Sequence, residues 1–129
     1  MPVIRAEHAP TFSLPGLEVI GLAAPSRGST ENSVWRIRLA PSEPGAPSTG
    51  VTHSLNKEEI FVALSGRAIA TVGDEQIEFS AGDTLVIPRN QLFSLGNPGP
   101  DPFEAVAMAS AGIQAQIGDG DAFTPPWCA

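Results

Sequence analysis

Two side chains, His53 and Glu59, are the residues of this sequence best suited to chemistry. An imidazole and a carboxyl group can act together as general base and general acid, and both can bind a divalent cation. Burial raises the pKa of a carboxyl group, while a neighbouring carboxylate raises the pKa of a histidine. The plainer alternative is that the two groups bond to each other or to nearby backbone and have only a structural role.

These side chains must be positioned by strands, because 13 glycines and 13 prolines recur along the whole chain of 129 residues. Both residues disfavour helix interiors, so few long helices fit between them. The segments that remain are rich in Val, Ile and Phe and often alternate, which predicts strands. We expect nine of them, at residues 18–23, 33–39, 59–64, 67–72, 76–79, 84–87, 92–95, 103–109 and 113–117. Short strands at this spacing predict an all-β sandwich or barrel.

Alternation also predicts which side chains face inward. Trp35 and Ile37 share one face of their strand, and Arg36 and Arg38 share the other face, which we expect to meet solvent. In the strand that begins at Glu59, this carboxyl group lies on the same face as Phe61.

Residues 53–66 and 82–97 together resemble the two signature motifs of the cupin superfamily. Glu59 and Gly66 fit the second half of the motif Gly-x5-His-x-His-x3–4-Glu-x6-Gly. Gly82, Pro88 and Asn97 fit the motif Gly-x5-Pro-x-Gly-x2-His-x3-Asn in register. The resemblance implies a single-domain cupin, which is an all-β double-stranded β-helix or jelly-roll barrel. Small cupins commonly form dimers, so it also implies a homodimer.

The sequence departs from the family at the metal ligands. The family pattern implies a metal held by three histidines and a glutamate, and here the matching positions hold His53, Leu55, Glu59 and Phe93. Leucine and phenylalanine have no lone pair to offer a metal. We therefore predict no metal cofactor, with at most a divalent cation held weakly by His53 and Glu59.

Without a metal, the barrel centre becomes an apolar pocket with a small polar island. His53 and Glu59 are the predicted catalytic residues, and the predicted ligand-binding residues are Trp35, Ile37, Leu55, Phe61, Phe93 and Leu95. Apolar walls with a few polar groups suit a small hydrophobic organic molecule. Such a pocket could bind this molecule only, or also catalyse acid–base isomerisation or cyclisation.

Two alternatives stay open. One is a divergent metal-dependent oxygenase or lyase that uses His53 and Glu59. The other is a non-catalytic sensor or interaction module, which a cavity below roughly 300 Å³ would favour. Whether the protein is an enzyme is thus not decided by the sequence.

The remaining features concern the whole chain. We expect one domain over residues 1–129, with an N-terminal arm at about 1–16, a barrel at about 17–117 and a tail at about 118–129. The net charge of −7 disfavours nucleic acid and anionic membranes as partners. The N-terminal residues lack the layout of a secretory signal, which predicts a cytoplasmic protein. The apolar tail with Trp127 should pack on the barrel or on a second subunit, and Cys128 has no identifiable base.

Overall fold

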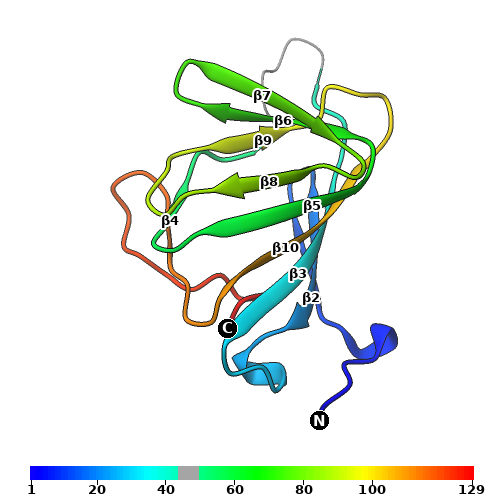
Figure 1. The fold of residues 1–129 in the computed structure, drawn as a ribbon, viewed down its shortest axis with the longest axis vertical. Coiled ribbons are helices and arrows are strands. Elements are labelled where there is room, and N and C mark those ends of the chain that lie inside the picture. The colour runs from blue at the N-terminus through cyan, green and yellow to red at the C-terminus, as the bar shows by residue number, and fades with distance from the viewer. Residues whose placement is uncertain (44–49) are drawn as a thin grey trace.

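The computed structural model describes residues 1–43 and 50–129, and these residues form two facing β-sheets (Figure 1). The strands are β1 (Thr11–Leu14), β2 (Leu17–Ala23), β3 (Asn32–Leu39), β4 (Ser54–Leu55), β5 (Glu59–Ser65), β6 (Arg67–Val72), β7 (Glu75–Ser80), β8 (Thr84–Ile87), β9 (Ser94–Gly96), β10 (Phe103–Ser110) and β11 (Ala115–Gln116). Two short 3-10 helices, η1 (Ala6–His8) and η2 (Pro25–Arg27), flank the first hairpin. The predicted all-β jelly-roll architecture is confirmed.

The first sheet has six strands in the order β1-β2-β3-β10-β5-β8. Its inner face has small residues at the centre, because the buried residues of β10 after Phe103 are Ala105, Ala107 and Ala109. Trp35 and Phe61 lie opposite Ala107 on the two neighbouring strands. Large side chains on β3 and β5 thus stand on either side of a row of alanines, and this row leaves space in the middle of the barrel.

The second sheet is built from shorter pieces. The order β7-β6-β9 forms its main part, and β11 pairs with β4. A backbone bridge between His53 and Phe93 joins these two parts, with both hydrogen bonds 3.0 Å long. A second bridge, between Ala115 and Phe123, adds the C-terminal segment to the same side. The two signature motifs are therefore connected directly through the main chain of His53 and Phe93.

The corner residues of the motifs have clear mechanical roles. Gly66 has a φ of 77°, and a Cβ atom there would lie 2.7 Å from the carbonyl oxygen of Pro102. Only glycine fits this close approach without strain. The buried Asn97 donates hydrogen bonds to the carbonyl oxygens of Leu39 and Asp101, and it accepts one from the amide of Gly99. Its side chain therefore ties the turn before β10 to the end of β3.

Most predicted strands appear with ends that shift by one or two residues. In the segment at 92–95, β9 begins only at Ser94, and Phe93 takes part in the bridge to His53. Two strands were missed. β1 lies within the predicted arm and pairs with β2 across a turn at Gly16, whose φ is 72°, and β4 has only two residues.

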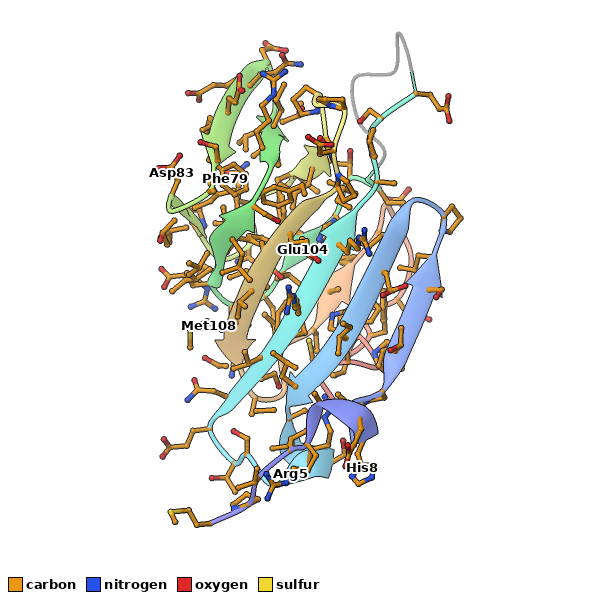
Figure 2. All side chains as sticks on the ribbon, turned by 90° about the vertical axis from the view of Figure 1, so that its right-hand side faces the viewer. Arg5, His8, Phe79, Asp83, Glu104 and Met108 are labelled. Carbon is orange, nitrogen blue, oxygen red and sulfur yellow. The ribbon has the colours of Figure 1, made fainter. Side chains whose placement is uncertain are left out.

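The outer face of the six-stranded sheet carries the charged side chains, as predicted (Figure 2). Arg36 forms a 3.3 Å ion pair with Glu104 on the neighbouring strand, and Arg38 is exposed. Over β5, β8 and β10 this face also has exposed apolar side chains, namely Val62, Leu64, Val86 and Met108. No helix in the described part of the chain is long and apolar enough to cross a membrane.

Candidate functional site

A cavity of about 370 Å³ lies between the two sheets. All eight residues predicted from the sequence line it: Trp35, Ile37, His53, Leu55, Glu59, Phe61, Phe93 and Leu95. The structure therefore brings together side chains from β3, β4, β5, β9 and the segments beside them. Further walls come from the first hairpin and the C-terminal segment, including Leu14, Leu17, Val19, Ile113, Phe123, Pro125, Trp127 and Cys128.

Glu59 is the most unusual group in this cavity. It is the first residue of β5, and its inward direction leaves only 4% of its surface exposed. Its Oε1 atom has no hydrogen-bond partner. Burial among apolar side chains raises the pKa of Glu59 to about 8, because the ionised form loses its hydration. At neutral pH the group is therefore mainly a neutral carboxylic acid, which can donate a hydrogen bond or a proton.

His53 presents the complementary group. Its Nδ1 atom lies 2.8 Å from the carbonyl oxygen of Val51, so the neutral ring carries its proton there. Its Nε2 atom is then an acceptor. Burial lowers the pKa of His53, and the hydrogen bond to Val51 opposes this shift only in part. The ring packs against Phe93, with 4.6 Å between the ring centroids.

Two expectations about this pair need correction. The pKa of His53 is lowered rather than raised, because burial is the larger effect and a protonated Glu59 offers no negative charge. Among the described residues, no hydrogen bond joins His53 to Glu59, since Nδ1 of His53 faces Val51 and Oε1 of Glu59 has no partner. The two side chains are therefore not bonded to each other, whereas His53 does bond to nearby backbone, at the carbonyl oxygen of Val51.

The donor set does not fit the metal centre that the resemblance implies. Leu55 and Phe93 line the cavity at two of the ligand positions and have no donor atoms. In the part of the chain that the structure describes, no three His, Cys, Asp or Glu side chains are grouped so that they could hold a metal ion. His8 lies on the surface, with about three quarters of its side chain exposed.

The C-terminal segment is the part of the site that sequence reasoning did not place there. Phe123, Pro125 and Trp127 recur at every second position, and all three line the cavity together with Cys128. The spacing of these large apolar residues was the available signal, although the segment ends in a turn in which the amide of Cys128 donates to the carbonyl oxygen of Pro125. The tail was expected to pack on the barrel or on a second subunit, and it packs on the barrel. Burial raises the pKa of Cys128 to about 12.

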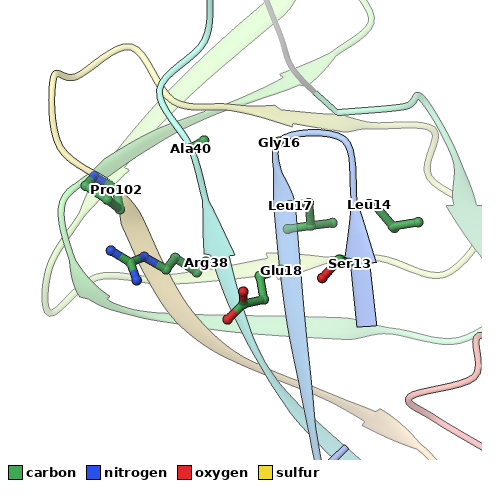
Figure 3. A pocket seen from close by; sticks show the side chains of 8 residues that line it. All are labelled: Ser13, Leu14, Gly16, Leu17, Glu18, Arg38, Ala40 and Pro102. Atoms are coloured by element: carbon green, nitrogen blue, oxygen red, sulfur yellow. The ribbon is translucent and has the colours of Figure 1, made fainter. Parts of the chain in front are cut away.

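A second depression lies over the first hairpin, with a volume of about 420 Å³ (Figure 3). Ser13, Glu18 and Arg38, which line it, are exposed. It has therefore no buried polar group directed into it, unlike the cavity that holds Glu59, and we place the candidate site in the latter.

Fold and motifs together define a β-barrel with a central cavity, and comparison with known proteins names its family. The cupin domain family matches residues 35–109, so the chain belongs to the cupin family. A mannose-1-phosphate guanylyltransferase from Salmonella muenchen is 31% identical over 74 residues. That match covers 57% of this chain but only 15% of the longer protein.

Solved structures support the same fold at low sequence identity. The polyketide cyclase RemF from Streptomyces resistomycificus has a TM-score of 0.69 and 16% identity, over 85% of this chain and 79% of its own. A sugar phosphate isomerase of the cupin superfamily from Silicibacter pomeroyi has a TM-score of 0.67 and 15% identity, over 93% of this chain and 83% of its own. These similarities establish the fold, whereas function depends on the residues of the cavity.

Proposed function

We propose that this protein binds a neutral, mainly hydrophobic organic molecule in the cavity and catalyses its isomerisation or cyclisation by proton transfer. One observation carries the proposal: the buried carboxyl group of Glu59, whose Oε1 atom has no hydrogen-bond partner, lines a mainly apolar cavity. An unpaired buried polar group is costly to the fold, so a ligand atom that completes its hydrogen bonds would be bound favourably.

The charge of the cavity supports a neutral ligand. Among the described residues that line it, none is lysine or arginine, and Glu59 is the single acidic one. A phosphate group would therefore find no cation here, which disfavours sugar phosphates despite the similarity to an isomerase of such compounds. The cyclase similarity agrees better with apolar walls. The volume of about 370 Å³ lies within the usual range of ligand pockets, roughly 300–1,000 Å³, and favours ligand binding over a barrel filled by side chains.

The two polar groups would divide the chemistry between them. In the proposed step, Nε2 of His53 removes a proton from the carbon next to a carbonyl group, and Glu59 gives its proton to the carbonyl oxygen. A C–H bond breaks, an O–H bond forms and the product is an enol, while the protein is left with an imidazolium and a carboxylate. If the enol is conjugated with a C=C bond, the imidazolium can return its proton to a different carbon, while the enol O–H gives its proton back to Glu59 and the product is an isomer. In ring closure the enol carbon forms a C–C bond to a second carbonyl carbon, the imidazolium protonates that carbonyl oxygen, and the enol O–H gives its proton back to Glu59.

The first test measures this proton transfer directly. The neutral ketone 2-tetralone in D₂O should gain deuterium beside its carbonyl faster with the wild-type protein than without it. Glu59→Gln and His53→Ala should each lower the protein-dependent rate by about 10²–10⁴-fold, the usual contribution of a general acid or base. Glu58→Gln is the matched control, because Glu58 is an adjacent but exposed glutamate.

Binding is measured separately with the neutral fluorescent probe N-phenyl-1-naphthylamine. Wild-type protein should bind the probe, and 2-tetralone should displace it while glucose 6-phosphate should not. Unchanged exchange and binding in both variants, together with a similar loss of stability, would show that His53 and Glu59 are only structural.

We also propose that the protein is a homodimer, as the family resemblance implies. The exposed Val62, Leu64, Val86 and Met108 provide the apolar surface that such an interface needs. Light scattering after gel filtration should give twice the mass of 13.4 kDa, and Val62→Glu should give the monomer. A monomeric mass for wild-type protein at micromolar concentration would contradict this prediction.

A further inference from the structure

The C-terminal segment lines one side of the cavity, and Arg27 is one of the residues whose side chain binds its main chain. Arg27, in η2, donates a 2.9 Å hydrogen bond from Nη2 to the carbonyl oxygen of Trp127 and another of 2.9 Å from Nε to the carbonyl oxygen of Leu22. Among the described residues, Arg27 has no carboxylate partner within ion-pair distance. Its guanidinium group therefore links two stretches of main chain rather than neutralising an acid.

The surroundings of Arg27 are shaped for this link. A Cβ atom on Gly21 would lie 2.6 Å from Nη2 of Arg27, so the glycine leaves room for the guanidinium group. The next two carbonyl groups of the segment are held from the same end of the barrel. The buried Ser33 hydroxyl donates to Cys128 at 2.8 Å, and the Ser26 hydroxyl donates to Ala129 at 2.6 Å.

The segment is thus fastened at both of its ends across the cavity. At the far end, Phe123 exchanges two backbone hydrogen bonds with Ala115, of 2.7 and 3.0 Å. Between these ties, Pro125, Trp127 and Cys128 line the cavity. The rings of Trp127 and Phe12 pack edge to face, with their centroids 6.0 Å apart.

We propose that Arg27 is a positioning residue that holds residues 123–128 as a wall of the cavity, and so controls how tightly the site is closed. The effect of this wall on ligand binding rests on the proposed function, whereas closure of the wall can be measured without a ligand. Arg27 does not line the cavity and acts only through the segment.

Cys128 reports whether the wall is closed. It is 1% exposed and is the only cysteine of the chain, so the rate of thiol modification reports how often this position becomes exposed. Its raised pKa further slows its reaction in the closed state. The experiment compares the rate of N-ethylmaleimide modification in native buffer for wild-type protein, Arg27→Ala, Arg27→Lys and the control Arg36→Ala, in which the lost ion pair lies on the outer face.

We expect Arg27→Ala to raise the modification rate about tenfold or more, as befits the loss of hydrogen bonds from a charged donor. Arg27→Lys should recover part of the protection, and Arg36→Ala should match wild type. The faster reaction of Arg27→Ala should also be independent of low urea concentrations, because local opening exposes little surface, whereas global unfolding makes the rate rise with urea. Wild-type protection in folded Arg27→Ala, or a rate that rises steeply with urea, would overturn the inference.

If Arg27→Ala does not fold, Arg27→Gln is measured in its place with the same two criteria. The variant with the faster modification should also bind N-phenyl-1-naphthylamine about fivefold or more weakly than wild type. Such a loss would show that the wall contributes to ligand binding. Protection that depends on Arg27 in a protein that binds no probe would contradict the proposed function alone. Probe binding without such dependence would contradict the positioning role alone.

Discussion

Raising the pH from 5 to 8 is expected to destabilise the wild-type protein relative to its Glu59→Gln variant by roughly 4 kcal/mol. The pKa of Glu59 is about 8 in the folded protein against 4.5 as the ordinary value, so the unfolded chain releases this proton first as the pH rises. The contribution of protonated Glu59 to the free energy of unfolding is therefore fully present below pH 4.5. It decreases by about 1.4 kcal/mol per pH unit as the pH rises from there to about 8.

Urea unfolding at several pH values measures this effect. Other titrating groups contribute to the pH dependence of both proteins, so the difference between wild type and Glu59→Gln isolates Glu59. The exposed neighbour Glu58 provides the control, and Glu58→Gln should follow the wild-type curve. Parallel curves for wild type and Glu59→Gln between pH 5 and 8 would mean that Glu59 is hydrated or ion-paired rather than dry and protonated.

The double substitution Leu55→His with Phe93→His is expected to create a tight site for Zn²⁺ or Ni²⁺. Leu55 lies two residues after His53, and both line the cavity; Phe93 is paired with His53, with their rings 4.6 Å apart. Two new imidazoles beside His53 and Glu59 would supply four donors. The affinity for Zn²⁺ or Ni²⁺ should rise by more than about 100-fold. Residues that only hydrogen-bond to metal ligands already change metal affinity by about 10–100-fold, and direct ligands contribute more.

Titration calorimetry, with a colorimetric chelator in competition, compares this variant with wild type. The matched control is Leu55→Val with Phe93→Leu, which removes the same side chains without adding donors. Phe93 is fully buried, so both variants should lose some stability, and only the first should recover it when metal is added. A folded variant with unchanged affinity would show that these positions do not match the family's ligand positions.

Local pattern was sufficient for most strands, because prolines and glycines mark their ends and alternation marks their faces. It failed where the strand itself is too short to carry a pattern. β1 has four residues between two prolines, and β4 has two residues that depend on pairing with β11. Such strands are defined by their partners, which a local reading does not contain.

The site divides in the same way. His53, Leu55, Glu59 and Phe93 could be located from motif spacing, and Trp35 and Phe61 from alternation. The wall at 123–128 depends on contacts between residues about one hundred positions apart, such as Arg27 with Trp127. The lowered pKa of His53 could not be predicted either, because it depends on how deeply the ring is buried and not on which residues are near it in sequence.

The backbone bridge between His53 and Phe93 joins two positions that match metal ligands in the family, and it does so without a metal ion. Amide and carbonyl groups form both hydrogen bonds of this junction, so the bridge does not depend on which side chains stand there, although their packing adds stability. Because the main chain itself connects these two segments, the stability of the barrel does not depend on a bound metal ion. Stripping the protein with a chelator should accordingly leave its melting temperature where it was.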